Sequence, residues 1–282
     1  MANPIDINGT HYLRERYADT IIKLMRQQFN IRNDFSRDYE RDPVSGAINI
    51  PVRNGDITLS DYDILNGITL TQSATTYTQV LLDNHKAFSE LVDGYEAVAI
   101  PDNLRAQRLE SAAYILGKTL EESAIDALVD EGTTEASTTP LSTSTAYTTI
   151  ATSIKTLKAR GISANDLRVA VSADTELLLL TDDKFANTSG QLGADLVRQG
   201  VIGKINGVMV RANYLMPSNV EYIVYAPMWC QSIDEWKVTP NFVDINDGQH
   251  VGASALQGRM IYKDTVTNAL AVQVKTNGVL SI

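Results

Sequence analysis

Residues 101–132 read PDNLRAQRLESAAYILGKTLEESAIDALVDEG and predict one unusually long helix. Asp102 follows a proline and can act as the N-cap, and Gly132 follows the last predicted helical residue, Glu131. At 1.5 Å per residue the helix is roughly 40 Å long, whereas helices in globular proteins average about 11 to 12 residues. We therefore expect this helix to be the structural spine of the fold.

An apolar stripe runs along the predicted helix at spacings of three and four residues. Its middle is formed by Leu116 and Leu120, which we expect to be buried. Glu121 and Glu122 are assigned to the polar side, where glutamine replacements should leave stability almost unchanged. The stripe consists of Leu109, Ala113, Leu116, Leu120, Ala124 and Leu128.

The N-terminal side of the spine predicts a helix and then a ribbon of two strands. Residues 10–29 have amphipathic helical spacing, and their basic face is either a docking surface or a solvated face. Residues 48–53 alternate with period two, and Pro51 restricts them to an edge strand. Residues 68–82 supply the second strand, and the span between the strands reads as polar. This ribbon has few apolar residues of its own, so it needs another surface to lie on.

The C-terminal side of the spine mixes helices and strands, so the predicted class is α+β. Residues 133–153 contain thirteen Ser or Thr, and their first half reads as a loop and as the best domain boundary. A helix with Ile150, Ile154 and Leu157 on its stripe then ends at Gly161. Ser172 is predicted to cap a short helix that ends at Leu180. Strands are predicted at 167–171, 208–211, 222–226, 259–263 and 269–275.

Composition excludes several classes of protein. The 282 residues carry 24 Lys and Arg against 34 Asp and Glu, a net charge of −10. Such acidity argues against a nucleic-acid reader, because phosphate binding needs clustered basic residues, so any contact with DNA should be loose. The longest strongly apolar run, Leu177–Leu180, is far too short to span a bilayer, and we expect no membrane or secretory targeting. A single cysteine, Cys230, fits a reducing cytoplasm.

No catalytic, cofactor-binding or metal-binding residues are predicted. The glycines match neither a dinucleotide fingerprint nor a phosphate-binding loop, and a nucleophile elbow is absent. A calcium loop near Asp244 has compressed spacing and lacks the final glutamate. Cys230 reads as a buried inert thiol. The least implausible participants in a site formed only by folding are Asp61, Asp63, His85 and His250, and His11 stands alone.

Several short motifs together resemble a known family. The chain resembles the major capsid proteins of tailed double-stranded-DNA bacteriophages, which share the Hong Kong ninety-seven capsid fold, over about residues 44–282. The matching motifs are Val80-Leu81-Leu82-Asp83, Lys86-Ala87-Phe88, Val92-Asp93-Gly94-Tyr95-Glu96, the helix Leu104 to Val129, Val171-Ser172-Ala173, Asp182-Asp183-Lys184-Phe185, and the run from Gly200 to Val208.

The resemblance implies four regions and a structural role. Residues 1–43 correspond to the N-terminal arm, 44–85 to the extended β-hairpin loop, 86–144 and 243–282 to the peripheral domain with the spine helix, and 145–242 to the axial domain. Copies of the chain would form hexamers and pentamers of an icosahedral shell around DNA, assembled in the bacterial cytoplasm with a portal. The arm is too short to be a fused scaffold, which implies a separate scaffolding protein.

Some family members crosslink a lysine of the extended loop to a neighbour, but this chain has no lysine between Asp42 and His85.

Two other interpretations of the chain remain open. Within the same fold, the chain could instead be an encapsulin-type shell that holds enzyme cargo. From a different class, it could be an enzyme whose site is assembled only in three dimensions.

Overall fold

The fold is described from a computed structural model, which covers residues 29–39, 46–53, 59–68, 75–92, 104–182, 184–185, 201–245, 249 and 252–278. The predicted helix at 10–29, the Asp102 cap, His11, His250 and the centre of the calcium-like loop lie outside these residues. Within the described residues the chain divides into two compact units. One contains residues 87–116 and 237–259, and the other contains residues 27–86, 117–236 and 260–278.

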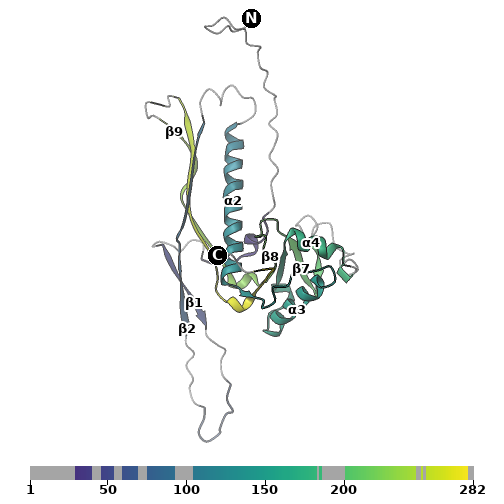
Figure 1. Ribbon diagram of the computed structural model, residues 1–282. Coiled ribbons are helices and arrows are strands. Elements are labelled where there is room, and N and C mark those ends of the chain that lie inside the picture. Colours follow the sequence, from purple (N-terminus) through teal and green to yellow (C-terminus); the bar gives the residue numbers. More distant parts are fainter. Residues whose placement is uncertain are drawn as a thin grey trace, which may run out of the picture. The chain divides into compact units, whose positions relative to one another are not determined.

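A mixed six-stranded sheet forms the centre of the larger unit (Figure 1). Its central strand β8 (Val220–Tyr225) is buried along its whole length, since it pairs antiparallel with β5 on one side and with β11 on the other. The order is β4 (Thr133–Thr134), β11 (Val272–Thr276), β8, β5 (Arg168–Val171), β7 (Val208–Ala212) and β6 (Val201–Ile205). Strands β6 and β7 form a hairpin in which Asn206 and Gly207 adopt positive φ, as a tight two-residue turn requires.

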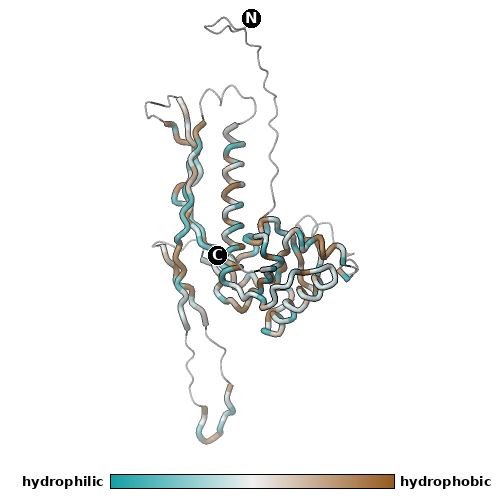
Figure 2. The backbone as a smooth tube through the Cα atoms, viewed as in Figure 1, coloured by the Kyte–Doolittle hydropathy of each residue, from teal (hydrophilic) through white to brown (hydrophobic). Residues whose placement is uncertain are grey.

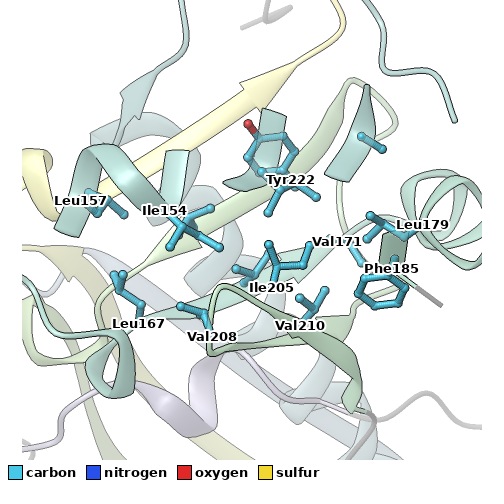
Figure 3. Close-up of a cluster of buried hydrophobic side chains, with 14 of the residues drawn as sticks. Ile154, Leu157, Leu167, Val171, Leu179, Phe185, Ile205, Val208, Val210 and Tyr222 are labelled. Atoms are coloured by element: carbon cyan, nitrogen blue, oxygen red, sulfur yellow. The ribbon is translucent and has the colours of Figure 1, made fainter. Parts of the chain in front are cut away.

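One face of this sheet packs against two helices. Helix α3 (Ala146–Ala159) buries Ile150, Ile154 and Leu157 completely, as the sequence predicts, and stops before Gly161, whose φ is +91°. Helix α4 (Ala173–Leu180) is capped by Ser172, whose Oγ accepts a hydrogen bond from the Thr175 N–H. Figure 3 shows the resulting core, in which side chains of α3 meet those of the sheet strands.

The opposite face of the sheet packs against the C-terminal half of α2 (Leu104–Glu131), which confirms the predicted long helix. Side chains of adjacent residues in β5 and β8 point alternately into the core on the α3 side and into the core on the α2 side. The sheet is therefore covered on both faces. Ala124, Ile125 and Leu128 are buried against Ile223 and other strand residues.

The predicted apolar stripe on α2 is only partly correct. Leu109 and Ala113 are exposed, and Leu116 and Leu120 are half-buried. A step of four residues advances the side chain by about 400°, so a stripe of repeated four-residue steps drifts around the helix and leaves the buried face. Ala124 and Leu128 of the stripe are buried as predicted, and they share the buried face with Glu121 and Ile125.

A second sheet has the order β3-β10-β9. Its strands are β3 (Asn84–Val92), β10 (Ser254–Val266) and β9 (Cys230–Asp244), the last being 15 residues long. Of these, only residues 259–263 were predicted as a strand. Within the smaller unit the ring of Phe88 covers Gly258 so closely that an added Cβ would lie 2.6 Å from it. The remaining described elements are η1 (Arg32–Asp34), β1 (Ala47–Arg53), β2 (Thr75–Leu81), η2 (Ala164–Asp166), η3 (Pro227–Trp229) and η4 (Ala269–Ala271).

The first half of the serine- and threonine-rich segment is confirmed as a loop that follows β4, and hydrogen bonds to the sheet hold it in place, while its second half belongs to α3. The Glu135 N–H donates to the Val274 carbonyl at 2.8 Å, and the Leu141 N–H donates to Glu221 Oε1 at 2.8 Å. The two compact units divide elsewhere, at positions within α2, β3, β9 and β10. No helix in the described part of the chain combines the length and apolarity needed to cross a membrane.

Replacing Leu128 by Ala should destabilise the subunit far more than replacing Leu109. Leu128 is fully buried, so its loss should cost about 2 to 5 kcal/mol through lost burial and a residual cavity. Leu109 is 40% exposed, and its replacement should cost less than about 1 kcal/mol. Urea unfolding of the unassembled variants measures both values, and equal losses would contradict the buried face assigned here.

Candidate assembly surface

The extended ribbon predicted from residues 44–85 is present as a two-stranded sheet. Strand β1 pairs antiparallel with β2, with Ile48 opposite Val80 and Pro51 opposite Tyr77. Because the sheet has two strands, both are edges, which confirms the position expected for Pro51. Ile48 and Ile50 are buried while Asn49 and Pro51 are exposed, as the alternation predicts.

The base of the ribbon packs on its own chain. Ile48, Ile50 and Val80 form a small core with Leu82 and with Ile233 of β9. One face of the ribbon therefore finds the supporting surface it needs on its own chain. The opposite face remains open, and Tyr77 and Leu81 are exposed on it.

Residues 59–68, between the two strands, form a defined turn. Asp63 and Gly67 exchange two backbone hydrogen bonds, of 3.3 and 2.8 Å, and Gly67 adopts a φ of +72°. The Asp63 carboxylate accepts a hydrogen bond from the Leu65 N–H at 2.8 Å and another from the Asn66 side chain at 2.8 Å. The first of these, with help from the second, lowers the pKa of Asp63 below its ordinary value.

This turn, hereafter the loop tip, presents large apolar side chains to solvent. Leu59 and Leu65 are each 92% exposed and Ile64 is 88% exposed, while Tyr62 and Ile68 are also exposed. Figure 2 shows hydrophobic and hydrophilic positions side by side in this segment. The sequence prediction of a polar span is therefore wrong here. An exposed apolar cluster of this kind is typical of a surface that another molecule covers.

A buried carboxylate fixes the segment that precedes the ribbon. Glu121 is completely buried on α2 and accepts hydrogen bonds from three successive backbone N–H groups, those of Asn30 at 3.0 Å, Ile31 at 2.8 Å and Arg32 at 3.0 Å. The Asn213 side chain donates a fourth bond at 2.7 Å. The assignment of Glu121 to the polar side of the helix is therefore wrong, and we call residues 29–36 the anchored segment.

Two further charged groups hold the anchored segment. Arg32 is buried and donates to Asp234 at 2.9 Å and to Asp264 at 3.2 Å. Asp34 accepts two bonds from Arg211, at 2.9 and 2.7 Å, and a third from the Tyr225 hydroxyl at 3.0 Å. Burial, reinforced by the Asp34 carboxylate, raises the pKa of Tyr225 well above its ordinary value, so this hydroxyl remains a donor.

The anchored segment makes two further contacts. One is a backbone bridge to a strand, and the other is the packing of an aromatic ring on α2. Ser36 forms a parallel bridge with Gln231. The Phe29 ring lies against Gly117 of α2, where an added Cβ would come within 2.8 Å of the ring. Gly117 is therefore needed for close approach of the segment to the helix.

Of the side chains considered for catalysis, Asp61, Asp63 and His85 lie in the described part of the chain. Asp63 organises the loop tip, and His85 lies exposed on β3. Cys230 is fully buried, and burial raises the pKa of its thiol well above the ordinary value, which confirms an inert thiol. Among the residues described, no three His, Cys, Asp or Glu side chains are placed to bind a metal ion.

A cleft of about 340 Å³ beside α2 is lined by acidic side chains. Burial raises the pKa of Asp126 above its ordinary value, and the nearby carboxylates of Asp130 and Glu122 add to the effect. Lys263 at the same cleft pairs with Asp83 at 3.3 Å. The described lining contains neither histidine nor cysteine, and its Ser123 hydroxyl is hydrogen-bonded to the buried Asp264 carboxylate, which also accepts from Arg32.

Comparison with known proteins identifies the fold. No protein-family model matches the sequence, and no curated protein matches it. Among solved structures, a chain of Mycobacterium phage Che8 is 20% identical, with a TM-score of 0.76 over 95% of this chain and 98% of that chain. A chain in the capsid structure of cyanophage P-SCSP1u is 10% identical, with a TM-score of 0.76 over 96% of both chains. The mature capsid of bacteriophage PhiM1 contains a chain 14% identical, with a TM-score of 0.71 over 94% and 92%.

The chain therefore has the α+β capsid fold of the Hong Kong ninety-seven type. The agreement extends over nearly the full length of both partners in each comparison. The predicted fold class is confirmed.

Replacing Glu121 by Gln should destabilise the subunit by about 2 to 4 kcal/mol, because the amide loses charge-assisted bonds and places its own N–H donors against backbone donors. Glu122 is the matched control, since it is half-exposed and pairs only with Lys118 at 3.6 Å. Its replacement by Gln should change stability by less than about 0.5 kcal/mol. Urea unfolding measures both, and an unchanged midpoint for Glu121→Gln would refute the anchor.

Proposed function

We propose that this chain is the major capsid protein of a tailed bacteriophage, a structural protein that assembles into a closed shell around double-stranded DNA. The observation that carries the proposal is the match to chains of two phage capsid structures over 96% and 94% of this chain. A match of that extent accounts for the described elements without an added catalytic domain. This extent of match supports a structural, non-enzymatic role.

The proposed regions follow the element order. Residues 1–43 are the N-terminal arm, 44–85 the extended loop, 86–144 and 243–282 the peripheral domain, and 145–242 the axial domain. With these bounds the two domains share the six-stranded sheet, because β4 and β11 come from the peripheral segments while β8, β5, β7 and β6 come from the axial one. The sheet would then hold the two domains of a subunit together.

The proposed partners are other copies of the chain, arranged as hexamers and pentamers. A separate scaffolding protein, a portal and packaged DNA complete the set, with assembly in the cytoplasm of the bacterial host. The net charge of −10 supports loose contact with DNA, because an acidic wall does not bind phosphates tightly. A membrane plays no part in this proposal.

The loop tip supports self-association. Leu59, Ile64 and Leu65 are exposed in the single subunit, and burying each would contribute about 1.5 to 3 kcal/mol. A neighbouring copy is the partner that a shell supplies to every subunit. The ribbon, supported on one face by its own chain, would carry the loop tip to that neighbour.

An encapsulin-type nanocompartment is the alternative within the same fold. A phage capsid and a nanocompartment are both shells, so the fold does not distinguish the two functions. The contents of the shell do distinguish them. The enzyme alternative gains no support from Asp63, whose carboxylate serves the turn of the loop tip.

Electron microscopy of the expressed chain, with and without the candidate scaffold and portal genes, tests the proposal. We expect closed shells or capsomers from the chain itself, and nuclease-resistant DNA in particles purified from infected cells. Particles that hold a protein cargo and no DNA would favour the nanocompartment. A chain that remains monomeric at high concentration and high salt would contradict both.

Replacing both Ile64 and Leu65 by Ser should abolish stable shells and leave the subunit folded. These side chains contact little of their own chain, so the melting temperature should shift by less than about 2 °C. Asp61→Asn is the control in the same turn, because Asp61 is exposed and polar, and it should assemble normally. Light scattering follows assembly. Normal shells from the double variant would show that the loop tip is not covered by a neighbour.

A further inference from the structure

Two exposed patches lie at opposite ends of the six-stranded sheet. Helix α3 ends shortly before β5 begins, and α4 starts directly after β5 ends. Strand β7 is parallel to β5, so Tyr214, which follows β7, lies at the same end as α4. The length of the strands separates the two patches, so they do not meet within one subunit.

The first patch, hereafter the α4 patch, is apolar and acidic. Leu177 and Leu180 of α4 and Tyr214 are each more than half exposed. The Tyr214 hydroxyl donates to Glu176 Oε2 at 2.9 Å, which holds the ring beside the helix. Asp174 adds a second carboxylate, and α4 contains no Lys or Arg. Exposed apolar side chains grouped in this way are typical of a surface that another molecule covers.

The second patch, hereafter the basic end, contains three cations of α3 and its C-cap. Lys158 Nζ donates to the Asn206 carbonyl at 2.7 Å, and the Arg160 guanidinium donates to the Leu270 carbonyl. Lys155 is exposed one turn before Lys158. Within the described part of the chain none of the three forms an ion pair with a carboxylate, so their charges stay available to a partner.

Apolar side chains complete the basic end. Leu270 in η4 and Met228 in η3 are each more than half exposed. Arg168, Tyr225 and Val272 are in register across β5, β8 and β11. Because η3 follows β8 and η4 precedes β11, both lie at the end of the sheet where β5 begins. The basic end is therefore cationic and apolar, whereas the α4 patch is acidic and apolar.

Charge decides which of these surfaces can meet. Copies with a net charge of −10 repel one another, so a contact between them is favoured where opposite charges face each other. Between residues 155 and 168 the only carboxylate is Asp166, and Arg168 offsets its charge. The loop tip is also apolar, but it carries Asp61 and Asp63, which would repel the carboxylates of the α4 patch. The basic end is the complementary partner.

We propose that the basic end of one copy docks on the α4 patch of the next copy. This inference rests on the proposed shell function and names one of its contacts. The contact joins two different patches, so it is heterologous, and a fixed rotation between successive copies closes it into a ring. Burial of the exposed leucines would supply affinity, while the opposite charges would fix the orientation of neighbouring copies.

Charge reversal in the full chain tests the contact, with light scattering to measure the critical concentration for assembly. Lys155→Glu with Arg160→Glu should raise this concentration about tenfold or more, and Asp174→Lys with Glu176→Lys should do the same. A chain with all four reversals has opposite charges at the contact again and should assemble as the parent does. Lys155→Arg with Arg160→Lys keeps both charges and is the matched control.

Mixing the two reversed variants tests whether the contact is heterologous. In an equimolar mixture each favourable contact joins one variant to the other, so rings must alternate. Six-membered rings can alternate and five-membered rings cannot, and native mass spectrometry distinguishes them. We expect even-numbered rings from the mixture, and five-membered rings of mixed composition would overturn the proposal.

A further variant tests the apolar part of the contact without a change of charge. Leu177→Gln with Leu180→Gln should keep the melting temperature of the unassembled chain and raise the critical concentration about tenfold. Normal assembly of this variant or of either charge-reversed variant would overturn the contact. So would four reversals that fold but do not restore assembly, since the basic end would then serve another partner, such as DNA phosphates. A parent chain that never assembles would contradict the proposed function itself.

Discussion

The described part of the subunit depends on one buried carboxylate. Glu121 is fully desolvated on α2, and three backbone N–H groups of the anchored segment together with Asn213 compensate the cost of its burial. Because the bonds are made to backbone groups, they fix the path of the chain itself. They place Arg32 between two aspartates and Asp34 against Arg211, so that a short segment joins α2, the six-stranded sheet and strands β9 and β10.

The subunit combines a sheet that is covered on both faces with a loop that exposes apolar side chains. Both faces of the six-stranded sheet are covered, by α3 and α4 on one side and by α2 on the other. The loop tip differs, since Asp63 and Gly67 give it a defined backbone while its leucine and isoleucine side chains remain in water. A turn that is ordered but exposes apolar side chains becomes more stable once a neighbour covers it, as the proposed shell function requires.

Much of the fold could be predicted from the sequence because its signals are local. The stripe of Ile150, Ile154 and Leu157 and the alternation around Pro51 depend only on helix and strand period, and both are confirmed. Strand β9 was missed because it is not buried beyond its first four residues. Strand β10 was found only at 259–263, because its alternating buried positions include Gly258 and Asp264, which do not read as apolar.

The sequence predictions for Glu121 and for the loop tip were wrong, and each error has a physical reason. Glu121 is three, four and seven residues before Ala124, Ile125 and Leu128, so its place on the buried face was visible in the sequence. Its charge suggested the polar side, since the compensating N–H groups lie about 90 residues away in the chain. The loop tip was read as polar from its Asp, Asn and Gly residues, but these form the turn and leave the apolar side chains outside.

Hydrogen–deuterium exchange of the unassembled subunit and of assembled particles tests this account most directly, because it separates the contacts within a subunit from those between subunits. The amides of Asn30, Ile31 and Arg32 should be protected in both states, since Glu121 binds them within one chain. The amides of residues 59–68 should exchange quickly in the subunit and slowly in the particle. Fast exchange of residues 59–68 in particles, or fast exchange of residues 30–32 in the isolated subunit, would contradict the account.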